Sequence, residues 1–318
     1  MSLRASDVDD VPAGEHAAPR PAGSGRLYVV GTPIGNLEDI TLRALRVLGS
    51  VPVLAAEDTR AAQHLLMHHR VRAGSGPPEI YSFFSGNEAA RTEQLLQVLH
   101  SGRDVALISE AGLPGISDPG QRLVAAARER GVPVEVVPGP SASLTALIGS
   151  GLRTERFLFV GFPPRAEGDR LALFGSLRHE PGTLIFYESP ERVHRTLGDL
   201  AAALGPQRPA CLARELTKLY EEHVTGTLAE LHARYAAAPP RGEVTLVVAG
   251  AAAQSATTAP SADAAAALCD LETEIRRRLA TGQGPKEIAT ALTLLSGQPR
   301  RKLYQLALLL KEHAPPGP

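Results

Sequence analysis

Between residues 26 and 151, short apolar runs alternate with segments of helical spacing, and this alternation constrains the fold more than any other feature. Strands that alternate with helices in this way form a mainly parallel sheet covered by helices. The sequence therefore predicts an N-terminal α/β domain over 25–141, with a further helix that begins after Ser141. Its expected strands lie in 26–31, 51–58, 79–84, 104–110 and 132–139.

The rhythm changes after Gly151, where strand patterns outnumber helical ones. Only two clear helical segments, 190–204 and 227–237, interrupt the apolar runs. Fewer helices per strand indicate a mixed or antiparallel sheet, and hence a second α/β domain over 142–250. Its expected strands lie in 156–162, 182–189, 208–216, 221–226 and 242–250.

The two ends of the chain differ from this α/β region. Residues 1–24 hold scattered charges, Pro, Gly and Ala without the apolar core of a signal peptide, which predicts a disordered tail. Residues 251–263 are a low-complexity linker, and 264–314 show three helical patterns. From 264 onward there are eight Lys and Arg against five Asp and Glu, whereas the whole chain has a net charge of −1. We therefore expect a small, basic, helical extension.

Several classes of protein are excluded by composition. The two cysteines, Cys211 and Cys269, lie far apart without a CxxC or Cys/His spacing, which argues against a disulfide framework and a zinc site. No apolar run reaches the roughly 18 residues of a membrane span. His64 and His68 have the i,i+4 spacing of metal ligands, but no nearby acid or cysteine completes a site, so we interpret them as a solvated helix face. These features indicate a cytoplasmic protein without a metal.

Three turns rich in glycine and proline each end a strand of the first domain. They are GTPIGN (31–36), EAGLPGISDPG (110–120) and VPGPSAS (137–143). In an open parallel sheet the carboxyl ends of the strands line one edge, where ligands bind. Glycines allow a close approach of backbone to ligand, and free amides at helix starts bind anionic groups. Neither GxGxxG nor GxxxxGK[ST] is present, so the turns predict a pocket for some other small polar ligand.

Eight motifs carry a resemblance to a known family over residues 27–248. They are LYVVGTPIGNLEDITLRAL, AAEDTR, SEAGLPGISDPG, VPGPSA, FVGFPPR, FYESPERV, RELTKLYEE and GEVTLVV, in this order. The chain resembles the tetrapyrrole-methylase-like (class III) methyltransferases, and most closely their bacterial branch that methylates the 2′-oxygen of a cytidine in the decoding region of 16S rRNA. The basic extension resembles the C-terminal extension of that branch. The resemblance implies a two-domain fold, a small-ribosomal-subunit substrate and a homodimer.

The resemblance also implies S-adenosylmethionine as the cofactor, folded between the two domains against the Gly/Pro turns. This family commonly reads Ser-Asp-Ala-Gly-Thr-Pro where the present chain has Glu110 and Leu113, so a side-chain hydrogen bond from position 113 is lost while backbone contacts remain possible. The cofactor-binding residues carried over are Thr32, Pro33, Gly112, Leu113, Pro114, Ile116, Ser117, Ser141, Ala142, Phe162 and Tyr187.

Methyl transfer to a ribose hydroxyl needs a group that accepts or orients its proton, and it requires no metal. The candidates for this base are Glu57, Asp58 and Glu188. Each has a competing structural interpretation: Glu57 and Asp58 as parts of a plain helix start with Asp58 as its cap, and Glu188 as a partner in a salt bridge. The expected RNA-binding residues, each of which could instead belong to a solvated or ion-paired surface, are Arg60, Arg214, Lys218, Arg300, Arg301 and Lys302.

Two other functions compete with RNA methylation. A tetrapyrrole methyltransferase of precorrin type would share the fold, but it has no need of a basic phosphate-binding extension. A non-catalytic RNA-binding module would also share the fold, but it has no need of intact cofactor turns. The sequence therefore favours the RNA methyltransferase.

Overall fold

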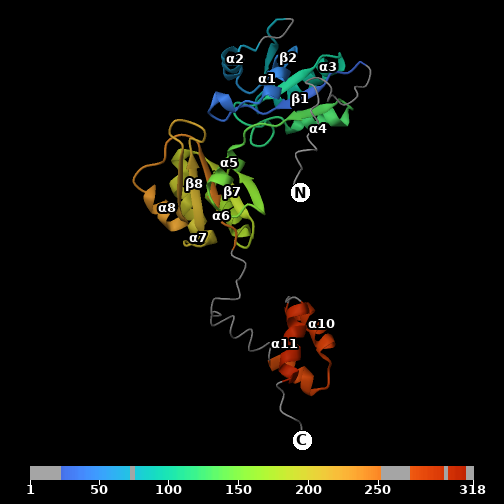
Figure 1. Ribbon diagram of the computed structural model, residues 1–318, viewed down its shortest axis with the longest axis vertical. Coiled ribbons are helices and arrows are strands. Elements are labelled where there is room, and N and C mark those ends of the chain that lie inside the picture. Colours follow the sequence, from blue (N-terminus) through green and yellow to red (C-terminus); the bar gives the residue numbers. More distant parts are fainter. Residues whose placement is uncertain (1–22, 72–75, 252–272, 297–299, 313–318) are drawn as a thin grey trace, which may run out of the picture. The chain divides into compact units, whose positions relative to one another are not determined.

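A computed structural model describes residues 23–71, 76–251, 273–296 and 300–312 of the chain (Figure 1). The chain divides into two compact units, Met1–Ala253 and Gln254–Pro318. The predicted tail up to residue 22 and the predicted linker from residue 252 onward lie outside the described residues.

The first unit begins with a five-stranded sheet in which every pairing is parallel, as the alternation of strand and helix predicts. The strand order is β3-β2-β4-β1-β5. Every residue of β2 and β4 is buried, as expected of apolar strands covered on both faces. The strands are β1 (Leu27–Val30), β2 (Val53–Ala56), β3 (Glu79–Ser82), β4 (Val105–Ile108) and β5 (Val134–Val137).

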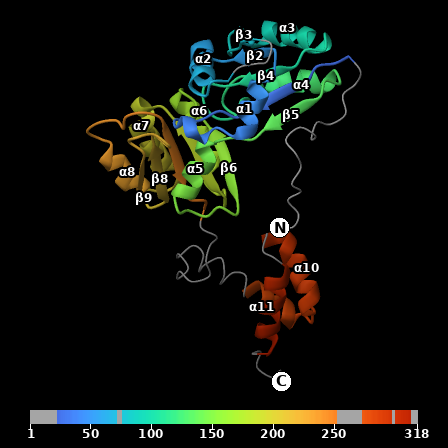
Figure 2. The same ribbon diagram turned by 45° about the horizontal axis from the view of Figure 1, so that its top comes forward.

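Four helices cover the two faces of this sheet (Figure 2). On one face α1 (Leu42–Leu48) and α2 (Thr59–His68) pack against Val30, Leu54 and Ala106. On the other face α3 (Glu88–His100) and α4 (Gln121–Glu129) bury leucines at helical spacing against alternate strand residues. The carboxyl ends of all five strands therefore remain at one open edge, where the three Gly/Pro turns begin.

The second sheet has the order β6-β7-β10-β8-β9. Only the β6–β7 pair is parallel and the other pairs are antiparallel, so the predicted mixed sheet is confirmed. The strands are β6 (Phe157–Gly161), β7 (Thr183–Glu188), β8 (Pro209–Arg214), β9 (Glu222–Thr227) and β10 (Val244–Val248).

One face of the second sheet carries α6 (Glu167–Ser176), α7 (Val193–Leu204) and α8 (Leu228–Arg234), and the other carries α5 (Ala142–Gly149). A 3₁₀ turn, η3 (Pro190–Arg192), leads into α7, as another, η2 (Leu37–Asp39), leads toward α1. Helix α6 was not among the two helices expected after residue 151. Its N-cap, Ala166, has no capping side chain, and two glycines lie within its ten residues, so local signals for a helix are weak there.

The two sheets share a small apolar cluster. Ile34, from the turn that follows β1, is buried with Ile185 of β7, Cys211 of β8 and Val247 of β10. Leu216, in the loop after β8, completes this contact. Residues of the GTPIGN turn are therefore fixed by both sheets, which places this turn at their junction.

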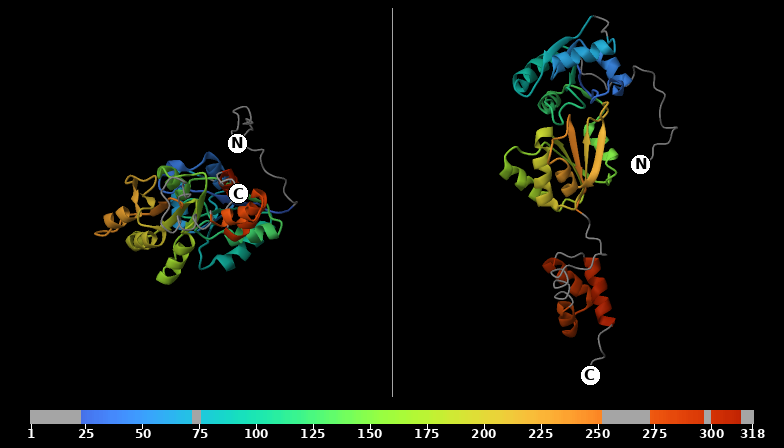
Figure 3. Two further views of the ribbon diagram at one scale, coloured as in Figure 1. Left: turned by 90° about the horizontal axis from the view of Figure 1, so that it is seen from below. Right: turned by 90° about the vertical axis from the view of Figure 1, so that its left-hand side faces the viewer.

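The second unit is a helical bundle of residues 273–280, α10 (Pro285–Ser296) and α11 (Arg300–Glu312), whose last two helices lie side by side in Figure 3. Its core contains Ile275, Ile288, Leu292 and Leu303. Pro285 opens α10, as predicted for a proline in the first turn. Within the described parts of the chain, no helix combines the length and apolar character needed to cross a membrane.

Candidate active site

The three predicted turns meet at the open edge of the first sheet. The Thr32 amide donates to the Gly112 carbonyl at 2.9 Å, and the Gly112 amide donates back to the Thr32 carbonyl at 3.2 Å. Gly31 lies against Gly139, so closely that a Cβ atom on Gly31 would stand 2.8 Å from the Gly139 Cα atom. Only glycine allows such an approach of two backbones. One rigid backbone platform therefore joins the turns after β1, β4 and β5.

Side chains of the predicted cofactor set continue from this platform to the second sheet. Ser141 is the N-cap of α5, and its hydroxyl lies 3.0 Å from that of Ser143. Ser143 in turn lies near Tyr187 of β7, whose pKa it lowers against the larger effect of burial. The Tyr187 ring packs edge-on against Phe162, with ring centres 5.6 Å apart. The structure thus brings residues of both sheets to one place.

The chemical surface of the predicted cofactor set is part polar and part apolar. Thr32 and Pro114 are buried, whereas Ile116 is 60% exposed and Phe162 is 56% exposed. Large apolar side chains exposed beside a backbone platform offer a binding surface for the flat part of a ligand. Leu113 is half-buried and packs near Gly31.

Three carboxylates belong to the turns that follow β2 and β4, and we call them the acidic cluster: Glu57, Glu110 and Asp118. Glu57 Oε2 accepts a hydrogen bond of 3.2 Å from the Glu110 amide. Burial, followed by the charge of Glu57, raises the pKa of the nearby Asp118 to about 6; a hydrogen bond from Ser109 opposes this rise, and the charge of Glu110 adds to it. Burial raises the pKa of Tyr187 as well, and the charge of Asp118 contributes. The charges of Glu57 and Glu110 therefore act on Asp118, and the charge of Asp118 acts on Tyr187.

Asp118 is a functional candidate that the sequence analysis missed. It stands in the ISDPG stretch that had already been identified as part of a ligand-binding turn. A partly buried carboxyl whose pKa is raised to about 6 is suited to accept a proton from a substrate hydroxyl. Glu57, which the sequence predicted as a candidate base, belongs to the same cluster.

Asp58 caps α2, the role that competed with catalysis in its interpretation. Its Oδ1 atom accepts hydrogen bonds from the amides of Arg60 at 2.7 Å and Ala61 at 3.2 Å. These bonds to the ionised form hold the pKa of Asp58 below its usual value. The Arg60 side chain is 91% exposed and lies 3.7 Å from Asp58 Oδ2. Arg60 therefore remains available to a partner.

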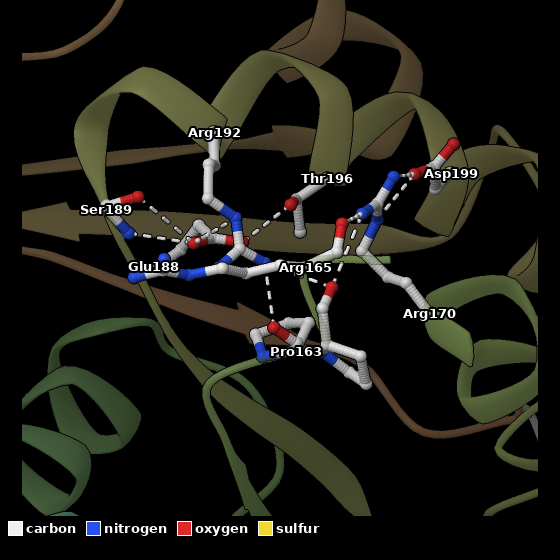
Figure 4. Close-up of polar contacts among 9 residues, drawn as sticks. Pro163, Arg165, Arg170, Glu188, Ser189, Arg192, Thr196 and Asp199 are labelled. Carbon is white, nitrogen blue, oxygen red and sulfur yellow. Dashed lines mark hydrogen bonds and ion pairs between the residues drawn. The ribbon is translucent and has the colours of Figure 1, made fainter. Parts of the chain in front are cut away.

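Glu188 lies away from the predicted site. It shares the face of β7 that α6, α7 and α8 cover, whereas Tyr187 points to the opposite face. Glu188 is 2% exposed, accepts a 2.6 Å bond from the Thr196 hydroxyl and forms an ion pair with Arg192 at 3.3 Å (Figure 4). Its proposed role as the base does not fit this position, because internal donors occupy both of its oxygens.

The network around Glu188 fixes the loop that follows Phe162. Arg192 donates to the Pro163 carbonyl at 2.7 Å, and Arg170 donates to the Arg165 carbonyl at 3.0 Å (Figure 4). Arg170 is 1% exposed and pairs with Asp199 at 2.6 Å. Hydrogen bonds from Arg170 and Arg192 therefore hold the backbone of the FPPR motif in place.

The predicted RNA-binding cations have different surroundings. Arg214 pairs with Glu222 at 2.7 Å, and Lys218 lies 3.0 Å from both Glu215 and Glu243. Arg301 and Lys302 are exposed at the start of α11, whereas the side chain of Arg300 lies outside the described residues. Arg214 and Lys218 thus have partners within the protein, whereas Arg301 and Lys302 face solvent.

A cavity of about 230 Å³ adjoins the acidic cluster. Its wall includes Thr32 and Ile34 of the first turn, His64 of α2, Glu110 after β4, and the Lys218–Glu243 pair of the second sheet. Among the side chains that the structure describes, no group of three or more His, Cys, Asp or Glu is arranged to hold a metal ion.

Comparison with known proteins gives one consistent family. The sequence profile of the tetrapyrrole (corrin/porphyrin) methylases matches residues 26–232. A protein of Micromonospora olivasterospora named ribosomal RNA small subunit methyltransferase I is 46% identical, over 93% of this chain and 90% of its own. A protein of the same name from Synechocystis is 42% identical, over 90% of this chain and 99% of its own.

Solved structures share the fold. Uroporphyrin-III C-methyltransferase from Thermus thermophilus, in complex with S-adenosyl homocysteine, has a TM-score of 0.51 at 24% identity, covering 71% of this chain and 97% of that chain. The methyltransferase CobJ has a TM-score of 0.54 at 20% identity, covering 72% and 95%.

Proposed function

Because this chain belongs to the tetrapyrrole (corrin/porphyrin) methylase family and is a methyltransferase, we propose that it methylates ribosomal RNA of the small subunit with S-adenosylmethionine. The relatives that support the RNA substrate align over about nine-tenths of the chain, and they carry the same name. A tetrapyrrole substrate is not favoured by these names. More specifically, we propose that the methyl group is accepted by the 2′-oxygen of a cytidine in the decoding region of 16S rRNA.

The residues of the open edge fit this cofactor. The contact between the backbones at Gly31 and Gly139 fixes the shape of the turns that are proposed to hold the ligand. The exposed side chains of Ile116 and Phe162 provide apolar surface beside them. We propose that S-adenosylmethionine is held by Thr32, Pro33, Gly112, Leu113, Pro114, Ile116, Ser117, Ser141, Ala142, Phe162 and Tyr187.

The mechanism requires one proton acceptor and accurate alignment. When bound, S-adenosylmethionine supplies a methyl group activated by its sulfonium. Asp118, ionised above a pKa of about 6, accepts the proton of the attacking ribose hydroxyl. Burial keeps the pKa of Asp118 high enough for this transfer, and the negative charges of Glu57 and Glu110 add to this effect because they disfavour its ionisation. The partial burial of the Asp118 carboxyl within the turn that follows β4, which raises its pKa, is the observation that carries this assignment.

Methyl transfer from labelled S-adenosylmethionine tests the function. The substrates are small subunits that lack the modification, protein-free 16S rRNA and a tetrapyrrole precursor, followed by nucleoside analysis of the RNA. We expect label in 2′-O-methylcytidine from the subunits. Label in the tetrapyrrole alone would reject the RNA substrate, and a folded protein that labels nothing would favour the non-catalytic RNA-binding module.

The choice of substrate leads to two further proposals about the working enzyme. It acts in the cytoplasm, where small subunits are assembled, and it acts as a homodimer, as the family resemblance implies. The mass of the purified chain by light scattering distinguishes a dimer from a monomer.

A further inference from the structure

We propose that the cavity between α2 and the Lys218–Glu243 pair receives the base of the target nucleotide. This inference rests on the proposed RNA substrate and identifies the part of that substrate which the cavity binds. Among the described residues of its wall, the cavity shares only Thr32 and Pro33 with the proposed cofactor-binding set. It is therefore a second compartment of the site, separated from the aromatic pair of Phe162 and Tyr187.

The charges of the cavity wall favour a base over a phosphate. Glu110 and Glu243 contribute two carboxylates, against the single ammonium of Lys218. That ammonium already lies 3.0 Å from Glu243 and 3.0 Å from Glu215. A phosphate would add negative charge where negative charge is already in excess. The exocyclic amine of cytosine is a neutral donor, and carboxylates are its usual acceptors in proteins.

The size of the cavity selects a single ring. Its volume of about 230 Å³ lies below the roughly 300–1,000 Å³ of pockets for drug-sized ligands, which suits a single base better than a tetrapyrrole or a complete S-adenosylmethionine. Ile34 and Leu65 provide apolar wall, and the imidazole of His64 provides a flat polar group. A base turned out of its stack requires this combination of apolar faces and polar edges.

The position of the cavity agrees with methylation of the attached ribose. Glu110 belongs both to the cavity wall and to the cluster of charges around Asp118. Glu243 lines the cavity as well, and its charge acts on Tyr187 together with that of Asp118. A base held in the cavity thus places its ribose beside the turn that contains Glu110 and Asp118.

The test replaces a small side chain of α2 that lines the cavity with larger side chains that would fill it. Ala61 lines the cavity, whereas Gln63, two residues further along the same helix, is exposed outside it. We compare Ala61→Phe and the milder Ala61→Leu with the matched control Gln63→Phe. Three quantities are measured: binding of S-adenosylmethionine by calorimetry, binding of cytidine by saturation-transfer NMR with S-adenosyl homocysteine present, and methylation of small subunits.

We expect Ala61→Phe to abolish the cytidine signal and to lower kcat/KM for subunits at least tenfold, while cofactor affinity stays within twofold of wild type. Gln63→Phe keeps all three properties. Absence of a cytidine signal with the wild-type protein, unchanged methylation in Ala61→Phe, or an equal loss of cofactor affinity overturns the inference. If the wild-type protein binds cytidine but methylates no subunit, and Ala61→Phe loses the cytidine signal, the proposed function fails while the base-binding cavity stands.

Discussion

The carboxyl of Asp118 determines the pH range in which the proposed site works. Its pKa is raised to about 6, mainly by burial, and only the ionised form accepts a proton. Turnover should therefore fall as the pH drops through about 6 and stay level above it. Asp118→Asn should lower kcat by about 10²–10⁴-fold, the usual contribution of a general base. Single-turnover rates between pH 5 and 8 and calorimetry of cofactor binding check this prediction, and full activity in Asp118→Asn would remove Asp118 from the mechanism.

Glu57 offers a way to move that pH dependence without removing Asp118. Its charge is the second cause of the raised pKa, so Glu57→Gln should shift the acidic limb of the rate profile to lower pH. Glu129→Gln, at an exposed position of α4, serves as the control and should leave the limb in place. If the acidic limb of the rate profile lies at the same pH in Glu57→Gln as in Glu129→Gln, a group other than Asp118 titrates. Loss of activity at every pH in Glu57→Gln would instead identify Glu57 as the base.

The sequence could locate the turns of the site but not the pKa of a residue within them. Glycine and proline at three strand ends were local signals, and the structure brings Thr32, Gly112 and Gly139 together. The pKa of Asp118 depends on burial and on Glu57, which is 61 positions distant and meets it only through sheet pairing. Glu188 was wrongly placed for a related reason. It ends a strand, as site residues often do, but its side chain turns to the face of the sheet that helices cover.

At the scale of elements, Arg170 connects α6, α7 and the loop after β6. Its side chain is 1% exposed, pairs with Asp199 and donates to the Arg165 carbonyl. Arg170→Ala should lower the free energy of unfolding by about 3–5 kcal/mol, because it leaves the Asp199 carboxylate and two main-chain carbonyls without their donor. Arg165→Ala is the control: that side chain is exposed, and only its main-chain oxygen is used. Urea unfolding measures both, and equal stabilities would contradict the structural role of Arg170.

The contact between the turns after β1 and β5 leads to a prediction about cofactor affinity. A Cβ atom on Gly139 would stand 2.8 Å from the Gly31 Cα atom, so Gly139→Ala must separate the two turns. We predict at least a tenfold loss of affinity for S-adenosylmethionine by calorimetry, because the backbone platform loses its shape. Gly168→Ala, at a helical glycine with open space around it, should bind the cofactor normally. Normal binding by Gly139→Ala would place the cofactor elsewhere.

Elements with strong local patterns were predictable, and those fixed by distant contacts were not. The buried strands β2 and β4 and the amphipathic α2 follow from apolar periodicity and, for α2, from Asp58 at its N-cap. Helix α6 was missed because Arg170 and Phe174, which bury it, act through tertiary contacts and not through helix propensity. The strand order β3-β2-β4-β1-β5 depends on long-range pairing in the same way.

At the scale of the whole molecule, the chain combines a unit that carries the proposed chemistry with a helical unit that carries exposed cations. Arg301 and Lys302 stand exposed at the start of α11, behind which Leu303 and Ala307 are buried in the core of the bundle. A folded bundle holds these two cations on a defined surface. Phosphate contacts from such a surface add affinity that is independent of sequence.

The double substitution Arg301→Gln and Lys302→Gln tests whether this helical unit contacts RNA. Each phosphate contact contributes about 0.7–0.9 to the slope of log affinity against log salt concentration, so losing two should reduce the slope by about 1.4–1.8. Affinity for small subunits should fall while cofactor affinity is retained, since both side chains belong to Gln254–Pro318 and the cofactor turns belong to Met1–Ala253. Lys311→Gln, an exposed cation near the other end of α11, should change the slope less. An unchanged slope in the double variant would assign the basic surface a role other than RNA binding, and Arg60 would become the next cation to test.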